Sequence, residues 1–336
     1  MLPRLVRISF LLLLLLLASL TLAWQRVALL LSPLSTESKQ QIITIPLGAS
    51  LMEIGRILEE KKIIRSATVF RYLVKYNGVG KELRAGEHLL SAGMSAKEVV
   101  DSLVKGQMKM YRLTVPEGMT MAEMARLIEA KKLAKADRMT ALFQDEAFIR
   151  ALGITAGTLE GCLFPETYYF VANTRAEDIA KAMVRRFFKV WAPYEKLAGE
   201  SGMTRHEIVT LASIVEKETG ARSERPLIAA VFLNRLKRKM PLQSDPTVIY
   251  GLQDFDGNLT RSHLETYTPY NTYQFTGLPP GPIANPGEAS LKAVLEPAEV
   301  KYLYFVSKND GTHHFSRSLT EHNRAVNRYQ KHSFRR

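Results

Sequence analysis

An uncharged, leucine-rich run near the amino terminus limits most strongly what this chain can fold into. Residues 8–25 carry no charge, with Arg4 and Arg7 before them and Arg26 directly after. As an α-helix this run spans about 27 Å, close to the roughly 30 Å thickness of the hydrocarbon core of a bilayer. A secretory signal has a shorter apolar core of about 7 to 15 residues and a clear small-residue cleavage site. We therefore expect an uncleaved transmembrane anchor, with a cleaved signal as the alternative.

The charges around this run predict its orientation. Basic residues in front of the span favour a cytoplasmic amino terminus, so the long remainder would be exported. We expect a cytoplasmic tail at 1–7, an anchor at 8–28 and a polar linker at 29–42. Cys162 is the single cysteine, so the fold cannot depend on an intramolecular disulfide. The chain is thus expected to be a single-pass protein of the bacterial inner (cytoplasmic) membrane, with its bulk outside the cytoplasm.

The net charge of +13 limits the choice of partner. A basic protein can bind nucleic acid through its phosphates, but an exported chain does not meet it. Anionic lipid headgroups or a cell-wall polymer that bears carboxylates suit the charge and the location better. The remaining explanation is a generally basic, solvated surface. We expect no nucleic-acid partner.

An internal repeat follows the linker. The segment IPLGASLMEIGRILEEKKI at 45–63 aligns without gaps with VPEGMTMAEMARLIEAKKL at 115–133. Each copy predicts a short strand, a Pro-x-Gly turn and a helix that begins with a capping box, Ser50 with Glu53 and Thr120 with Glu123.

The first copy belongs to a small α/β unit at 43–108, since the same start signal recurs at Ser95 with Glu98. This strand, turn and capped helix resembles a LysM domain, and that resemblance implies binding of glycans that contain N-acetylglucosamine. A repeat without sugar binding is the alternative. Residues 109–336 then form a larger mixed domain, so the expected fold class is α+β, with a transmembrane helix, a small LysM-like unit and a larger catalytic domain.

Two acids lie near the end of a predicted helix that begins after Thr204 and contains SIVEKETG at 213–220. Four apolar residues of this helix follow the spacing i, i+3, i+4 and i+7 and so define a buried face. They are Ile208, Leu211, Ala212 and Val215. Helical geometry turns Glu216 and Glu218 to opposite flanks of that face. One of them can therefore enter a cleft, but both cannot serve one site. A solvated helix end is the alternative for such a triplet.

Two polar, turn-rich segments follow. They are LQSDPTVIYG at 242–251 and YNTYQFTGLPPGPIANPG at 270–287. Amides, hydroxyls, tyrosines and rigid Pro/Gly turns are typical of a groove for a neutral polar polymer such as a sugar chain. Together with ASIVEKET, in this order and behind an apolar anchor, these segments resemble the endolytic murein transglycosylases of the MltG or YceG-like family over nearly the whole chain.

The resemblance implies an activity and a set of site residues. The family cleaves the β-1,4 bond between N-acetylmuramic acid and N-acetylglucosamine within peptidoglycan strands without water, and it leaves 1,6-anhydro ends. It implies Glu218 as the catalytic residue, Glu216 as a supporting residue, no metal and no organic cofactor, and cell-wall synthases as partners. The matching segments also indicate five substrate-binding residues: Gln243, Asp245, Tyr250, Asn271 and Tyr273.

Three other functions fit parts of the sequence. A peptidoglycan hydrolase would use a second carboxylate to activate water, and Asp245 is the candidate. A non-catalytic scaffold would bind the wall through the LysM-like unit alone. An aminodeoxychorismate lyase would use pyridoxal phosphate on a lysine in the cytosol, which an exported chain does not suit. The end groups of the digested glycan distinguish the first two from the transglycosylase.

Overall fold

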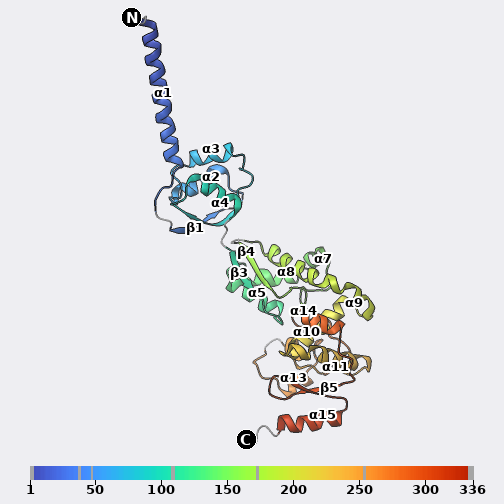
Figure 1. Cartoon of the computed structure of the whole chain (residues 1–336). Coiled ribbons are helices and arrows are strands. Elements are labelled where there is room, and N and C mark those ends of the chain that lie inside the picture. The colour runs from blue at the N-terminus through green and yellow to red at the C-terminus, as the bar shows by residue number, and fades with distance from the viewer. Residues whose placement is uncertain are drawn as a thin grey trace. The chain divides into compact units, whose positions relative to one another are not determined.

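The computed structural model describes residues 4–36, 39–46, 48–106, 110–171, 174–252 and 255–331. Within these ranges the structure is a mixed α+β fold, with an apolar helix at its amino terminus (Figure 1). Contacts divide the chain into two compact units. Unit 1 comprises residues 1–111 with 171–173, and unit 2 comprises residues 112–170 with 174–336.

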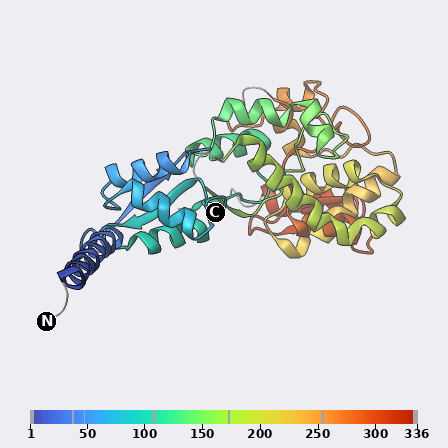
Figure 2. The ribbon, with the colours of Figure 1, turned by 90° about the horizontal axis from the view of Figure 1, so that it is seen from above.

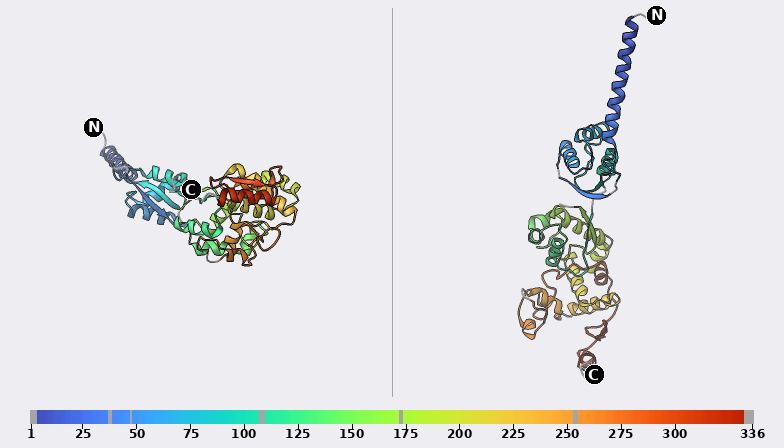
Figure 3. Two further views of the ribbon diagram at one scale, coloured as in Figure 1. Left: turned by 90° about the horizontal axis from the view of Figure 1, so that it is seen from below. Right: turned by 90° about the vertical axis from the view of Figure 1, so that its left-hand side faces the viewer.

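The leucine-rich run forms one long helix, α1 (Arg4–Leu31). Its apolar stretch Leu12–Leu31 has a mean hydropathy of 1.9, and none of it is buried by the rest of the described chain. Figure 3 shows α1 extending from unit 1 as a single rod. A helix of this length and composition can cross a membrane.

The rest of unit 1 is a two-stranded antiparallel sheet packed with three helices. The elements are β1 (Gln40–Ile45), α2 (Leu51–Glu60), α3 (Ala67–Tyr76), β2 (Gly86–Ser91) and α4 (Ala96–Lys105). Strand β1 pairs with β2 from Gln40 opposite Ser91 to Ile45 opposite Gly86. Their inward side chains and the apolar faces of the helices share one core, in which Ile43, Leu58 and Phe70 are fully buried.

The middle of the segment that was expected to be a linker forms hydrogen bonds with the rest of unit 1. The backbone N–H groups of Leu34 and Ser35 donate to the carbonyl of Ala92, at 2.9 and 3.0 Å. The Arg65 guanidinium donates to the carbonyl of Pro33 at 2.8 Å. Helix α1 also contacts α3 and α4. These bonds hold the end of α1 against unit 1.

The structure confirms the internal repeat as a repeated local fold. The first copy is β1 followed by α2, and the second is β3 (Met110–Thr114) followed by α5 (Met121–Ala130). Thr120 and Glu123 form the full capping box, whereas Ser50 caps α2 without the reciprocal bond. Two residues after the end of each helix lies a lysine with left-handed backbone, Lys62 at φ 55° and Lys132 at φ 58°. Equivalent sequence thus produced equivalent starts and ends.

Unit 2 is mostly helical (Figure 2). After α5 come α6 (Ala136–Phe143), α7 (Glu146–Ala151), β4 (Thr167–Val171), α8 (Ala176–Trp191), η1 (Ala192–Tyr194), α9 (Glu195–Ser201), α10 (Arg205–Glu218), η2 (Arg222–Glu224), α11 (Arg225–Lys237), α12 (Asp245–Gly251), α13 (Arg261–Glu265), α14 (Glu288–Leu295), β5 (Tyr304–Ser307), β6 (His313–Ser316), α15 (Leu319–Val326) and the π-helical turn η3 (Asn327–Lys331). Strand β3 bonds to β4, and β5 pairs with β6 as an antiparallel hairpin.

Helix α10 lies at the centre of the core of unit 2. It contacts α11, α12 and α14. The predicted buried face is confirmed, since Ile208, Leu211 and Val215 are almost inaccessible to solvent. The expectation of a single buried face was too narrow, because Thr210 and Ser213 on other sides of the helix are buried as well. Neighbouring helices surround α10 up to its last turn, which carries the two acids.

Candidate functional site

The last turn of α10 carries Glu218 into a cavity of unit 2. The helix begins at a full capping box of Thr204 with Glu207 and ends at Glu218. The cavity, of about 290 Å³, is lined by Glu218, Arg235, Leu242, Gln243, Asp245, Tyr273, Phe305 and His322. These residues come from α10, α11, the loop between α11 and α12, the start of α12, the loop after α13, β5 and α15. Segments far apart in the sequence therefore meet around one carboxyl group.

The surroundings of Glu218 suit a proton donor. Its Oε1 accepts a short hydrogen bond from the hydroxyl of Ser244. Burial raises the pKa of Glu218 to about 7, helped by the charge of Asp245 and opposed by the Ser244 hydrogen bond and the Arg235 charge. The carboxyl group is thus substantially protonated near neutral pH, as a general acid requires.

Polar groups around the cavity are held in place by their own hydrogen bonds. The Tyr273 hydroxyl donates to Oδ1 of Asp245 at 2.6 Å. Gln243 has a left-handed backbone, with φ 51°, and its N–H donates to the carbonyl of Thr272 at 3.1 Å. Non-glycine residues in this conformation store strain and concentrate at functional sites. The rim of the cavity is therefore rigid and polar.

Glu216 lies in a different environment from Glu218. Its side chain is 5% exposed and forms an ion pair with Arg225 at 2.5 Å. It also accepts hydrogen bonds from the N–H of Gly287 at 2.9 Å and the hydroxyl of Ser290 at 2.8 Å. The alternative of a solvated helix end is therefore wrong for both acids. Glu216 joins α10 to α11 and α14 and does not line the cavity.

The Pro-x-Gly turn of the second repeat copy lies against this end of α10. The Lys217 ammonium donates to the carbonyl of Gly118 at 3.3 Å. Glu117 lies 3.4 Å from the Arg225 guanidinium, so Arg225 is shared by two carboxylates. The repeat copy at 115–133 thus supports the helix turn that precedes Glu218.

The chain is similar to proteins of a known family. A family model described as the YceG-like family matches residues 43–328. The chain belongs to the YceG-like family. An endolytic murein transglycosylase of Bacillus subtilis is 37% identical over 317 residues, which cover 89% of this chain and 88% of that protein.

This YceG-like chain is also similar to a second sequence relative and to a solved structure. An endolytic murein transglycosylase of Streptococcus pneumoniae is 31% identical over 88% of this chain, which spans 60% of that longer relative. The crystal structure of a YceG-like protein from Listeria monocytogenes superposes with a TM-score of 0.60 at 36% identity. That superposition covers 86% of this chain and all of the Listeria chain.

The structure brings together some of the residues that the family resemblance indicated. Gln243, Asp245 and Tyr273 line the cavity with Glu218. Tyr250 does not line it, and its hydroxyl donates to the buried Glu160 at 3.1 Å. Asn271 is fully buried, and its amide group donates to the carbonyls of His263, Leu264 and Thr266. Tyr250 and Asn271 therefore hold the surrounding loops of this YceG-like chain.

Sequence reasoning missed three members of the site. Ser244 lies within the quoted QSDP segment, but nothing local indicates that its hydroxyl reaches Glu218. Arg235 lies in the last turn of α11, where it is buried and donates to the carbonyls of Leu303 and Leu242. His322 comes from α15 and stacks on the ring of Tyr304, at 5.2 Å between ring centroids. No sequence signal pointed to His322.

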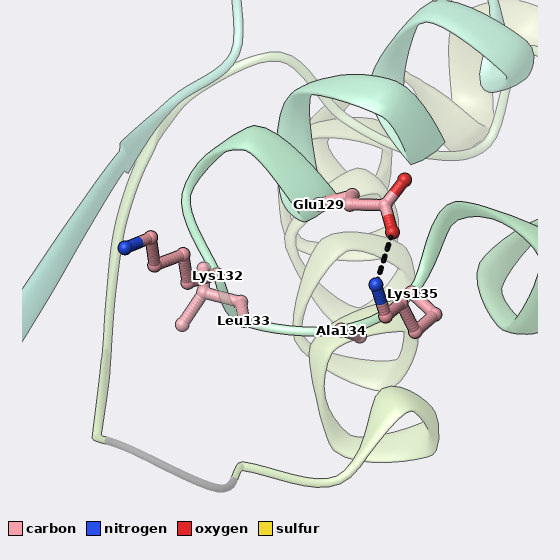
Figure 4. Close-up of a pocket in the computed structure, with 5 residues that line it drawn as sticks. All are labelled: Glu129, Lys132, Leu133, Ala134 and Lys135. Atoms are coloured by element: carbon pink, nitrogen blue, oxygen red, sulfur yellow. Dashed lines mark ion pairs between the residues drawn. The ribbon is translucent and has the colours of Figure 1, made fainter.

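A second hollow of the YceG-like fold lies in the loop between α5 and α6. It is lined by Glu129, Lys132, Leu133, Ala134 and Lys135. Figure 4 shows the Lys135 ammonium meeting the Glu129 carboxylate, at 3.1 Å, while Lys132 extends away from this pair. Both partners of this ion pair are well exposed, so the pair contributes little to stability. The cavity at Glu218 is the better candidate for chemistry.

Proposed function

We propose that this chain is an endolytic murein transglycosylase that cuts within nascent peptidoglycan strands. Its bond would be the β-1,4 link between N-acetylmuramic acid and N-acetylglucosamine, and its products would carry 1,6-anhydro ends. The observation that carries the proposal is a single half-buried acid, Glu218, whose pKa of about 7 suits proton donation. The relatives named as endolytic murein transglycosylases are similar in sequence to this chain over most of its length.

The proposed reaction needs only one carboxyl group. Glu218 donates its proton to the glycosidic oxygen, and the bond from that oxygen to C1 of the muramic acid breaks. The Glu218 carboxylate then takes the proton from the C6 hydroxyl of the same sugar, whose oxygen forms the new bond to C1. Glu218 is ionised when the leaving group departs and protonated again at the end. No water is consumed, and an intramolecular hydroxyl has a high effective concentration.

The cavity residues have complementary roles in this proposal. Ser244 stabilises the carboxylate that forms after proton donation, since its hydroxyl already donates to Oε1. Gln243, Asp245 and Tyr273 supply polar groups for the hydroxyls and acetamido groups of the sugars. Glu216 positions the helix end through Arg225 and does not touch the substrate. No step calls for a metal or an organic cofactor.

A two-carboxylate hydrolase is the second candidate, because Asp245 lines the same cavity. A hydrolase would use Asp245 to activate water or to form a covalent intermediate. In the structure the Tyr273 hydroxyl donates a hydrogen bond to one oxygen of Asp245, and this contact favours a role in substrate binding for the carboxylate. The reaction products separate the two functions.

Analysis of product ends tests the proposal. Peptidoglycan digested by the full chain should yield anhydro ends about 18 Da lighter than hydrolytic ends, one water being the difference. Glu218→Gln should abolish cleavage and keep the circular dichroism spectrum and melting temperature of a folded protein. Reducing ends from the wild type, with Asp245→Asn as damaging as Glu218→Gln, would identify a hydrolase instead.

The proposal extends to the location of the enzyme. Helix α1 would anchor the chain in the bacterial inner membrane by a single span, with residues 1–7 in the cytoplasm and the chain that follows α1 outside it. Protease added to spheroplasts should then degrade the chain from outside. Protection of the whole chain, or a mature amino terminus at Trp24, would contradict the anchor.

Residues 43–108 would act as a LysM-like glycan-binding domain, and 109–336 as the catalytic domain. Glu218 and the cavity residues all lie in unit 2, which supports this division of labour. A variant that lacks 43–108 should keep cleavage activity but bind less peptidoglycan. Unchanged binding to sacculi would make this domain structural only. Cell-wall synthases are the proposed protein partners, since cutting new strands near the membrane would set their length.

A further inference from the structure

Helix α3 of unit 1 presents an unusual outward face. Thr68, Tyr72, Lys75 and Tyr76 lie on one side of this helix, at positions i, i+4, i+7 and i+8, and all four are exposed. Tyr72 is 60% exposed and Tyr76 is 90% exposed. We call these four residues the α3 face. Two large aromatic rings, one helical turn apart on the same helix, are thus left in solvent.

The α3 face lies close to the point where α1 leaves unit 1. Helix α1 contacts α3, and Figure 1 shows α3 beside the end of α1. Arg65, just before α3, donates to the carbonyl of Pro33, two residues after the end of α1. Two residues of chain span at most about 7 Å. Unit 1 therefore cannot move far from the end of α1 while these bonds are intact.

The proposed anchor places this end of α1 at the membrane surface. The uncharged run stops at Gln25, and residues 26–31 continue the helix for about 9 Å. The headgroup layer on each side of a bilayer is roughly 5 to 8 Å thick, from the difference between the total and hydrocarbon thickness. Residues 26–31 therefore cross the headgroup layer, and α3 begins where that layer meets water.

The chemistry of the α3 face suits phospholipid headgroups. Tyrosine rings are enriched at this depth because their apolar body and polar hydroxyl match the boundary. The Arg71 guanidinium lies 5.1 Å from the centre of the Tyr72 ring, and Lys75 adds a second cation beside both tyrosines. Basic groups near an anionic leaflet gain attraction from its surface potential. The face thus combines interfacial aromatics with phosphate-binding cations.

We propose that the α3 face docks on the anionic phospholipid headgroups of the membrane that α1 spans. The inference rests on the proposed anchor. Docking lays unit 1 against the outer surface of the membrane, and the sheet of this proposed glycan-binding domain stays at a set height above the lipid. The distance between the membrane and a bound glycan is then determined by this contact together with α1, and not by a free linker.

Lipid quenching of a fluorophore on the full chain tests the docking. Thr68→Cys places a label on the α3 face without removing either tyrosine, and Thr44→Cys places one on exposed β1 as a matched control. Cys162 stays unlabelled, because burial raises the pKa of its thiol to about 12. The labelled chains are reconstituted into phosphatidylglycerol or phosphatidylcholine vesicles that contain lipids with a nitroxide on the headgroup. We expect strong quenching at position 68 and weak quenching at position 44, most clearly with phosphatidylglycerol.

Substitutions in the Thr68→Cys chain assign the effect to the α3 face. Lys75→Gln should lower the ratio of docked to undocked chains about fivefold, the value for one basic group at an anionic surface. Tyr72→Ser with Tyr76→Ser should reduce quenching to the level of position 44. Equal quenching at both positions, or no change in these variants, would overturn the proposal. Loss of quenching on addition of soluble glycan fragments would also overturn it, because the tyrosines would then bind sugar.

Vesicle flotation separates this proposal from the anchor. A chain that floats with vesicles, yet shows equal quenching at positions 68 and 44, keeps its anchor and refutes the docking. A chain that does not float has lost the anchor, and the docking fails with it. Peptidoglycan cleavage in detergent, where no bilayer is present, should be unchanged by Tyr72→Ser with Tyr76→Ser, so the enzymatic assignment is tested separately.

Discussion

The hydroxyl of Ser244 donates a hydrogen bond to Oε1 of Glu218, although 26 residues separate the two in the sequence. This bond stabilises the ionised carboxylate, and it therefore opposes the burial that raises the pKa of Glu218 to about 7. Burial thus keeps Glu218 protonated enough to donate a proton, and the Ser244 hydrogen bond stabilises the carboxylate that remains after the proton has left. The pH dependence of cleavage should report this balance.

Ser244→Ala should move the alkaline limb of the activity profile to higher pH. Loss of a hydrogen bond to a charged group costs about 1.5 to 3 kcal/mol, or roughly one to two pH units in the pKa of Glu218. Asp245→Asn should move the same limb to lower pH, because it removes a negative charge that raises this pKa. The measurement is the rate of glycan cleavage from pH 5 to 9 for both variants. Shifts in the same direction would contradict Glu218 as the titrating acid.

Glu216→Gln should destabilise unit 2 and leave the chemistry of folded molecules largely intact. The substitution removes a buried charge partner of Arg225, and breaking such a pair costs about 3 kcal/mol or more. Urea unfolding followed by tryptophan fluorescence measures this loss. The double variant Glu216→Gln with Arg225→Met should lose less than the two single variants together. A variant of normal stability and no activity would place Glu216 among the catalytic groups.

Glu160→Gln should make the protein more stable at pH 8 and change little at pH 5. Burial raises the pKa of Glu160 to about 7, so between about pH 4.5 and 7 the folded state binds more protons than the unfolded state. Unfolding free energy therefore falls as pH rises through this window, by about 3 kcal/mol for this group. Glu218 contributes a similar fall in unfolding free energy, so Glu160→Gln should keep part of the dependence of unfolding free energy on pH. Equal pH slopes in chemical denaturation would refute this assignment.

His322→Phe should weaken substrate use without unfolding the protein. Phenylalanine preserves the stacking on Tyr304 and removes the ring nitrogens that His322 brings to the cavity. Burial lowers the pKa of His322, so the wild-type ring is neutral near pH 7. Loss of one neutral hydrogen bond, about 1 kcal/mol, should lower kcat/KM roughly fivefold. His314→Phe is the matched control, because His314 does not line the cavity and should leave kcat/KM unchanged.

Local features of this protein were predicted correctly where the interactions involved are themselves local. Thr120 and Glu123 form the predicted capping box, and α10 begins after Thr204 as predicted, because capping bonds join residues three apart. The leucine-rich run forms α1, since its length and composition alone make it a helix long enough to span a bilayer. The family motifs also indicated Gln243, Asp245 and Tyr273, which line one cavity with Glu218, whereas the catalytic role of Glu218 stays a prediction.

Interactions between distant segments could not be predicted in this way. Helical spacing separated Glu216 from Glu218 but could not tell which acid would enter the cavity. That choice depends on Arg225, Gly287 and Ser290, which surround Glu216 with donors. Their positions follow from how the helices pack, and no spacing along one helix contains that information.

The sequence by itself thus determined where several helices begin, the repeat, the apolar amino terminus and the family. Only the tertiary structure decided that Ser244 meets Glu218, that Arg235 is buried at the cavity and that Tyr250 supports Glu160. The physical reason is how far along the sequence each kind of interaction acts. Capping and amphipathic patterns act within a few residues, whereas burial and the pKa values it sets depend on groups that only the packed core brings together.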